Sequence, residues 1–270
     1  MKIYASHLIE TEEMKDILRK YPINLEIVNF GSAMILDNWK YYLKEYKKEM
    51  DGFITSREVT IHGPFVDMSP GSPDKEIRRV ARDRFQQAFN IAKELGAKHI
   101  IFHSGYIQKV SYGEEWLENS KEFWKEFIEC NLNSLKGSMG RNGEEVNHEG
   151  LEIHIENVFD EDYILIKELI DYIHHPSFSA CLDIGHANAS SPKTLEHWIQ
   201  GLGKSIGYVH LHNNDGKHDY HNPLSKGTID VQDTLKLLGQ VSPNAPWCIE
   251  VFSKEGIIDS VELIESTAAI

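Results

Sequence analysis

The sequence predicts one domain of the α/β class, a single (β/α)8 TIM barrel over residues 1–270. Short β-branched or aromatic runs alternate eight times with helix-like stretches, which is typical of βα units around a parallel sheet. The length fits this architecture, because one such barrel needs about 250 residues. The alternation runs through the whole chain, so a second domain is not expected.

The predicted strands are rich in Val, Ile, Phe, Tyr and Trp, and each precedes a stretch with helical periodicity. Strands are expected near residues 2–7, 24–29, 58–62, 98–103, 151–156, 178–183, 206–211 and 246–251. Helices are expected near residues 11–20, 36–50, 74–95, 113–136, 160–173, 192–202, 230–239 and 257–268. The stretch 137–150 is expected to be a polar loop.

Local signals mark several helix ends. Gly96 follows an apolar-periodic helix, which is the usual C-terminal stop. Pro73 and Pro192 stand at first helical positions, where a missing N–H group is tolerated. Asp230 provides a capping oxygen ahead of the helix near 230–239.

Strand alternation decides which side chains face the barrel interior, because residues two apart share a face. His99, Ile101 and His103 are expected to face inward, and so are Glu152 and His154. Such a polar interior departs from the branched apolar residues that usually fill a barrel. Two interpretations stay open: a hydrogen-bonded network at the barrel floor, or outer partners that orient metal ligands.

Composition narrows the class of protein. A hydrophobic content of 41% supports a sizeable core, and no apolar run approaches the roughly 18 residues that span a membrane. The net charge of −14 disfavours a broad electrostatic footprint on DNA, which nevertheless stays open as a partner. Three widely spaced cysteines, an odd number, indicate reduced thiols and a cytoplasmic protein: Cys130, Cys181 and Cys248.

Metal-capable side chains close six successive predicted strands. These residues are His62, His103, Glu156, Asp183, His210 and Glu250. The carboxyl ends of barrel strands meet at one rim, where active sites are built. Three imidazoles and three carboxylates at that rim predict a divalent-metal site, with zinc or manganese as the favoured ions.

Three further candidate ligands lie in the loops after these strands: His186, Asp219 and His221. They bring the predicted ligand set to nine. His212 lies two residues beyond His210 on the same strand face and is an alternative to it. Lys226 is a candidate contact for a substrate phosphate, with an exposed loop lysine as the equal alternative.

Several motifs in order carry a resemblance to a known family. They are HGPF (62–65), FHSG (102–105), IEN (155–157), CLDIGH (181–186), VHLHNND (209–215), HDYHNPLSKGTID (218–230) and IEV (249–251). The chain resembles the xylose isomerase-like TIM barrel superfamily, in the branch that holds endonuclease IV and its sugar isomerase and epimerase relatives.

The resemblance to endonuclease IV implies a tri-zinc phosphoester hydrolase. His62 and His103 would then hold one ion, with Glu156 bridging to a second ion. The second ion would also be bound by Asp183, His210 and Glu250. The third ion would take His186, Asp219 and His221. Two or three zinc ions are therefore expected, with Glu250 orienting the nucleophilic water.

The resemblance to the epimerase branch implies a different reaction at a single metal ion. Glu156 and Glu250 would act there as an acid–base pair on a sugar or sugar phosphate, with His186 near the substrate. That chemistry does not need His62, His103, Asp219 and His221 together, so hydrolysis is the leading expectation. A sugar-binding or metal-storing barrel without turnover is the third hypothesis.

Overall fold

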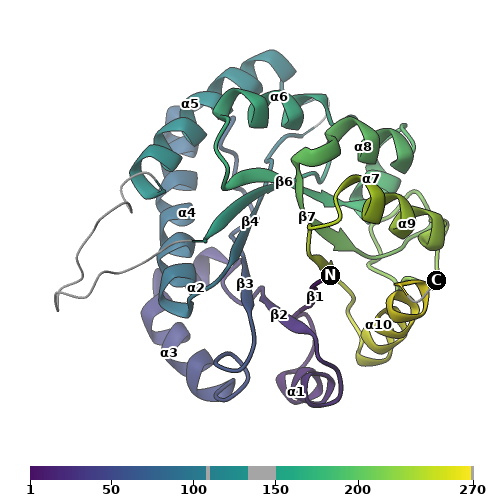
Figure 1. Ribbon diagram of the computed structural model, residues 1–270. Helices are drawn as coiled ribbons and strands as arrows, with labels where there is room; N and C mark the ends of the chain where they lie inside the picture. The colour runs from purple at the N-terminus through teal and green to yellow at the C-terminus, as the bar shows by residue number, and fades with distance from the viewer. Residues whose placement is uncertain (108–109, 133–149, 269–270) are drawn as a thin grey trace.

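Eight parallel strands form a closed barrel in chain order, and helices surround them in the computed structural model (Figure 1). The structure describes residues 1–107, 110–132 and 150–268. The strands are β1 (Ile3–Ser6), β2 (Asn24–Ile27), β3 (Val59–His62), β4 (His99–His103), β5 (Glu152–Glu156), β6 (Phe178–Asp183), β7 (Ile206–Leu211) and β8 (Trp247–Ile249). The predicted (β/α)8 barrel is confirmed.

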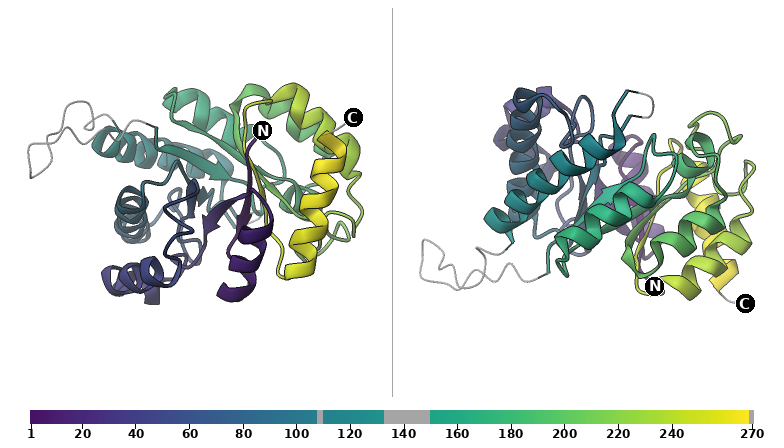
Figure 2. Two further views of the ribbon diagram at one scale, coloured as in Figure 1. Left: turned by 60° about the horizontal axis from the view of Figure 1, so that its bottom comes forward. Right: turned by 90° about the horizontal axis from the view of Figure 1, so that it is seen from above.

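Helices follow the strands and pack on the outside of the barrel, as two further views show (Figure 2). They are α1 (Thr11–Lys20), α2 (Ala33–Asp37), α3 (Trp39–Glu49), α4 (Lys75–Leu95), α5 (Gly113–Asn131), α6 (Ile164–Ile173), α7 (Ile184–Ser190), α8 (Leu195–Leu202), α9 (Val231–Val241) and α10 (Lys254–Ala268). In the described parts of the chain, no helix is both long and apolar enough to cross a membrane.

Several element boundaries differ from the sequence-based expectation. The helix expected at 36–50 is two helices, α2 and α3, which meet at Asn38. Strand β2 ends at Ile27, two residues earlier than expected, and α6 begins at Ile164 instead of 160. Helix α7 was not predicted at all. The loop expected at 137–150 lies outside the described residues except for Gly150.

Two layers of side chains hold the barrel together. Inside it, a small cluster of fully buried residues fills the middle: Tyr4, Ile101, Cys181, Tyr208 and Cys248. Outside it, alternate residues such as Ile100 and Phe102 join the large core between strands and helices. Phe102 stacks on Phe85 of α4 with ring centroids 4.2 Å apart. The predicted inward and outward faces of β4 are therefore confirmed.

The floor of the barrel holds a polar network well below the rim. His99 and His154 join through a 2.9 Å hydrogen bond, and the far nitrogen of His154 lies 2.7 Å from Ser179 Oγ. Burial lowers the pKa of His99 to about 4 and lowers that of His154 as well. Of the two interpretations of this polar interior, the hydrogen-bonded floor network is the one the geometry supports.

The floor network predicts an acid-sensitive stability. The pKa of His99 falls from 6.5 to about 4 on folding, so the unfolded chain takes up a proton that the folded chain refuses. The stabilisation is complete above pH 6.5 and is lost as the pH falls toward 4. By linkage, the free energy of unfolding at pH 5 is lower by about 2 kcal/mol than at high pH because of this one residue.

Urea unfolding of chelator-treated protein at pH 7 and pH 5 measures this effect. His99→Asn removes the titrating group, so its loss of stability between the two pH values should be smaller than that of the wild type by about 2 kcal/mol. An equal pH dependence in both proteins would contradict the assignment.

Candidate metal centre

The strand register brings the predicted ligands side by side at the carboxyl rim of the barrel. His103 lies beside Glu156 across β4 and β5, and Asp183 lies beside His210 across β6 and β7. Glu156, Asp183 and His210 are fully buried. Glu250 follows β8 and reaches the same space, with Oε2 3.6 Å from His210 Nδ1. The structure therefore brings the six predicted strand-end residues to one rim.

In the centre of the rim, which we call the central group, polar side-chain atoms face one another but do not form hydrogen bonds. Glu156 Oε1 and Asp183 Oδ2 lie 3.1 Å and 3.8 Å from His210 Nδ1. Within the described part of the chain, these three atoms are buried and lack a hydrogen-bond partner. Leaving buried polar atoms unpaired costs about 1–3 kcal/mol each. Two carboxylate oxygens and an imidazole nitrogen in this arrangement fit a divalent cation.

A second group lies on the β3–β4 side of the rim. His62 Nε2 and His103 Nε2 lie 3.2 Å and 3.4 Å from the other oxygen of Glu156, Oε2. These three residues offer ligand atoms that all lie within 4.8 Å of one another. Glu156 thus borders both groups, one with each oxygen, as a bridging carboxylate would.

A third group gathers the loop candidates on the β6–β7 side. His186 Nε2 and His221 Nε2 each lie 3.2 Å from Asp219 Oδ2. His212 joins them, so four ligand atoms lie within 4.8 Å of one another. The nine predicted ligands and His212 therefore occupy three adjoining groups at one rim. His212 does not replace His210, because each residue belongs to a different group.

Helix α7 places His186, and Asp183 starts that helix. Asp183 Oδ1 accepts a 2.6 Å hydrogen bond from the His186 backbone N–H, as an N-terminal cap does. Asn157 fixes the same corner, because its amide exchanges hydrogen bonds with the backbone of Asp183 across β5 and β6. The cap leaves Asp183 Oδ2 directed at the central group.

Three histidines are oriented by backbone carbonyls outside the groups. His62 Nδ1 is 2.9 Å from Gly63 O, His186 Nδ1 is 2.9 Å from Asn157 O, and His221 Nδ1 is 3.0 Å from Glu250 O. A carbonyl accepts only from an N–H, so each imidazole in its neutral form presents its Nε2 lone pair to the group. Metal-binding histidines are usually held in this way.

Glu26 is a functional candidate that the sequence interpretation missed. This fully buried carboxylate on β2 accepts a 2.8 Å hydrogen bond from Ser6 Oγ, and its other oxygen lies 3.2 Å from His210 Nε2. An N–H on Nε2 leaves His210 Nδ1 free to face the central group. The available signal was a glutamate between the two apolar residues Leu25 and Ile27 of a predicted strand.

The two central glutamates are in opposite electrostatic environments. Burial raises the pKa of the Glu250 carboxyl, and the charges of Glu156 and Glu26 add to this effect. Burial also opposes ionisation of Glu156, but the surrounding imidazoles, His210 first, hold its pKa well below the usual range. Pairs of carboxyls separated in this way are typical of acid–base sites.

Aromatic side chains border the rim. Phe65 lies with its ring centroid 5.3 Å from both His62 and His103, and Phe252 lies 4.9 Å from His221. Both are partly or largely exposed, so they offer apolar surface beside the polar groups. Lys226 is exposed on the loop after β7, and its proposed contact with substrate stays a prediction.

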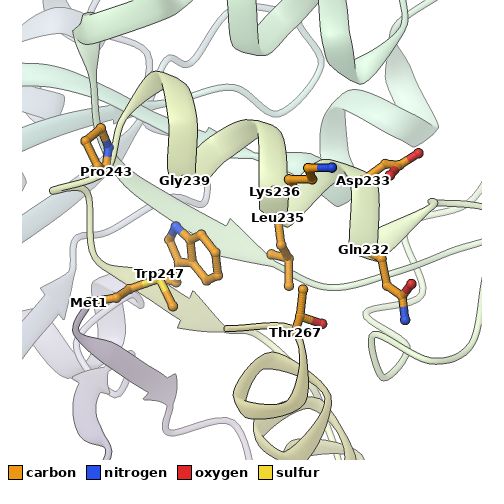
Figure 3. Close-up of a pocket in the computed structure, with 9 residues that line it drawn as sticks. All are labelled: Met1, Gln232, Asp233, Leu235, Lys236, Gly239, Pro243, Trp247 and Thr267. Atoms are coloured by element: carbon orange, nitrogen blue, oxygen red, sulfur yellow. The ribbon is translucent and has the colours of Figure 1, made fainter. Parts of the chain in front are cut away.

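A cavity of about 640 Å³ lies away from these groups, between α9, β8 and α10 (Figure 3). Trp247 begins β8 and Met1 precedes β1, so the cavity is near the amino ends of these strands, opposite the rim. Leu235, Trp247 and Thr267 point toward the shared space in Figure 3. Among the described residues that line it there is no histidine, so this part of the cavity does not reproduce the chemistry of the rim.

The fold and the rim define a class of protein. The family model of the xylose isomerase-like TIM barrel matches residues 23–267. The chain therefore belongs to the xylose isomerase-like TIM barrel family, as the motifs predicted.

Curated relatives of two kinds are similar to the chain. The uncharacterised protein MJ1311 of Methanocaldococcus jannaschii is 26% identical over 228 residues, which cover 78% of this chain and 73% of the relative. A probable endonuclease 4 of Mycobacterium leprae is 25% identical over 191 residues, which cover 66% of this chain and 67% of the relative.

Solved structures with the same fold include sugar epimerases and a zinc-soaked protein. A D-tagatose 3-epimerase-like protein has a TM-score of 0.76 and 24% identity, covering 100% of this chain and 97% of that one. D-allulose 3-epimerase from Methylomonas sp., solved with D-allulose, has a TM-score of 0.72 and 14% identity, covering 99% of this chain and 97% of that one. A Thermus thermophilus protein, soaked with ZnCl2, has a TM-score of 0.71 and 19% identity, covering 100% of this chain and 98% of that one.

The hydrogen bond between Glu26 and His210 predicts that Glu26 supports metal binding. Glu26→Gln removes the charge that stabilises the Nε2–H tautomer of His210. Zinc affinity, measured by competition with a coloured chelator, should fall about 10–100-fold. Glu262→Gln is the matched control, because the Glu262 carboxylate of α10 accepts a hydrogen bond from Tyr21 outside the barrel, and it should bind zinc as the wild type does. Equal affinities in both variants would contradict the role of Glu26.

Proposed function

We propose that the protein is a divalent-metal-dependent isomerase or epimerase of a small sugar or sugar phosphate, with Glu156 and Glu250 as the acid–base pair. The observation that carries this proposal is the central group, in which carboxylate oxygens of Glu156, Asp183 and Glu250 surround His210 Nδ1. Glu156 Oε1, Asp183 Oδ2 and His210 Nδ1 are buried and have no hydrogen-bond partner among the described residues. The sugar epimerases among the structural relatives support this choice of reaction class.

The donor set suits a divalent ion such as manganese or zinc. Such an ion, when bound, supplies Lewis-acid polarisation of substrate oxygens. The chain's own residues supply the proton transfer. One carboxylate removes a proton from the carbon beside a carbonyl, and the second, in its protonated form, returns a proton to the opposite face of that carbon or to its neighbour.

The raised pKa of Glu250 and the lowered pKa of Glu156 suit this division of roles. Burial favours the protonated form of Glu250, and the surrounding imidazoles favour the ionised form of Glu156, which is the direction that an acid–base pair needs. His186, at the border of the central and third groups, is proposed to lie near the substrate, on the Glu156 side of the central group. Phe65 offers an apolar face for the carbon skeleton of a sugar.

A second candidate function is a multinuclear phosphoester hydrolase of the endonuclease IV type. The specific observation that favours it is the presence of three adjoining groups of ligands, more than one ion requires. The similarity to a probable endonuclease 4 is consistent with it. In this case Glu250 would orient a nucleophilic water and His186, Asp219 and His221 would hold an ion that contacts the phosphate.

Deuterium incorporation tests the proposed acid–base pair. The metal-loaded protein is incubated in D2O with a panel of ketoses and ketose phosphates, and the recovered sugars are analysed by mass spectrometry. The expected result is exchange of one carbon-bound hydrogen by the wild type. Glu156→Gln and Glu250→Gln should slow it by a factor of about 10²–10⁴, because neither amide can carry the proton.

Asp219→Ala separates the two candidate functions. Its side chain belongs to the third group and does not contact the central atoms, so sugar exchange should fall only modestly. Phosphate release from a phosphoester panel that includes abasic-site DNA should collapse if hydrolysis is the function. If the wild type hydrolyses a phosphoester and exchanges no deuterium into any sugar, the isomerase proposal is contradicted.

A further inference from the structure

His212 is a buried histidine of the rim that neither candidate function uses. It is fully buried, and within the described part of the chain neither of its ring nitrogens has a hydrogen-bond partner. Its Nε2 is 3.1 Å from Asp183 Oδ1, which instead accepts the backbone N–H of His186. An imidazole buried without a partner is costly, so its presence calls for an interaction that a hydrogen bond does not provide.

The chain makes room for this ring. A Cβ at Gly185, in the first turn of α7, would lie 2.0 Å from His212 Cε1. The ring stacks on His221 with centroids 3.8 Å apart and an angle of 12° between the planes. His221 takes a positive φ of 47°, uncommon for a residue other than glycine, and this backbone turn presents its ring to the same place.

Four ligand atoms then surround one point. Asp219 Oδ2 lies 3.2 Å from both His186 Nε2 and His221 Nε2, and Asp219 Oδ1 lies 3.6 Å from His212 Nε2. Ligands at about 2.0–2.1 Å from a tetrahedral zinc ion stand about 3.3 Å apart. The spacings around Asp219 are therefore close to those of a tetrahedral zinc site, and a tilt of the stacked His212 and His221 rings away from each other would direct both Nε2 lone pairs at one ion.

We propose that His212 is the fourth protein ligand of an ion in the third group, and that it closes this site against substrate. The inference rests on the proposed metal-dependent function. Four protein ligands are typical of structural zinc, whereas catalytic zinc keeps an open position. An ion held by His186, His212, Asp219 and His221 ties the exposed tip of the loop after β7 to the barrel and leaves the reacting position to the central group.

The base of this loop is already held by side-chain hydrogen bonds, so the ion acts on its tip. Asn213 donates to Leu224 O and accepts from Ile229 N, which closes the loop near the barrel. Asp219 is substantially exposed and reaches back to the buried histidines. Loss of the ion should therefore loosen residues 215–221 without unfolding the barrel.

Zinc stoichiometry tests the proposal on the full-length protein. Wild type, His212→Ala, His212→Gln and Asp219→Ala are loaded with zinc, dialysed against a competing chelator and analysed by elemental mass spectrometry. Each variant is expected to keep one zinc ion fewer per chain than the wild type. The double variant His212→Ala/Asp219→Ala should lose no second ion. The affinity for this ion should fall by more than the roughly 100-fold limit for loss of an outer partner.

His212→Gln keeps the proposal falsifiable if His212→Ala is poorly folded. Glutamine can donate to Asp183 but cannot replace an imidazole on zinc. Full recovery of the zinc count in His212→Gln would show that His212 only positions Asp183, and would overturn the proposal. His218→Ala is the matched control, because His218 is an exposed histidine of the same loop that pairs with Asp215, and it should keep the wild-type count.

Limited proteolysis of the same proteins gives a readout that does not depend on turnover. Zinc should protect the 215–221 tip in the wild type and in His218→Ala, but not in His212→Ala or His212→Gln. A wild type that binds neither zinc nor, after parallel loading, manganese at the rim would defeat the proposed function itself. A wild type that binds zinc and exchanges deuterium, with an unchanged zinc count in the His212 variants, would defeat only this inference.

Discussion

The structure depends on how the carboxyl rim of the barrel neutralises its buried carboxylates. Glu26, Glu156, Asp183 and Glu250 reach one small volume and have almost no contact with water. Isolated buried charges are very costly, so such groups are paired, hydrogen-bonded or bound to metal. The buried imidazoles of the rim satisfy only part of this need, because Glu156 Oε1 and Asp183 Oδ2 keep no hydrogen-bond partner among the described residues.

The barrel makes this concentration of polar groups possible by placing it on a rigid frame. The strand register fixes His103 against Glu156 and Asp183 against His210 before any ligand binds. Backbone carbonyls and Glu26 then select the tautomers of the histidines. Preorganisation of this kind lowers the cost of binding an ion, because little conformational freedom remains to be lost.

The rim also explains why one fold can serve both proposed reactions. The central group holds the pair of glutamates that proton transfer needs, and the flanking groups hold ligands that hydrolysis can use. If His212 closes the third group, the ion there is part of the scaffold. The ligands of the third group are then accounted for without a phosphate-binding ion.

The sequence predicted the barrel because eight strand and helix periodicities alternate, and it predicted the strand-end ligands because parallel strands share a rim. It did not predict α7, whose residues Ile184–Ser190 include Gly, Asn and Ser with weak helical preference. That helix starts through the cap by Asp183 and the bracing by Asn157, which are tertiary contacts.

The roles of Glu26 and His212 were not predicted from the sequence, for related reasons. The second strand was expected to run to residue 29 but ends at Ile27, which brings Glu26 to the level of the rim. His212 was weighed only as a substitute for His210, because alternation assigns both to one face. Their separation into two groups depends on the loop after β7, whose path a single sequence does not specify.

Anomalous X-ray diffraction at the zinc absorption edge, on crystals grown with zinc, tests the central claim most directly. The account predicts one peak among Glu156, Asp183, His210 and Glu250, and a second peak among His186, His212, Asp219 and His221. Peaks confined to surface residues, or none at the rim, would contradict the account and leave the buried carboxylates to be explained by another partner.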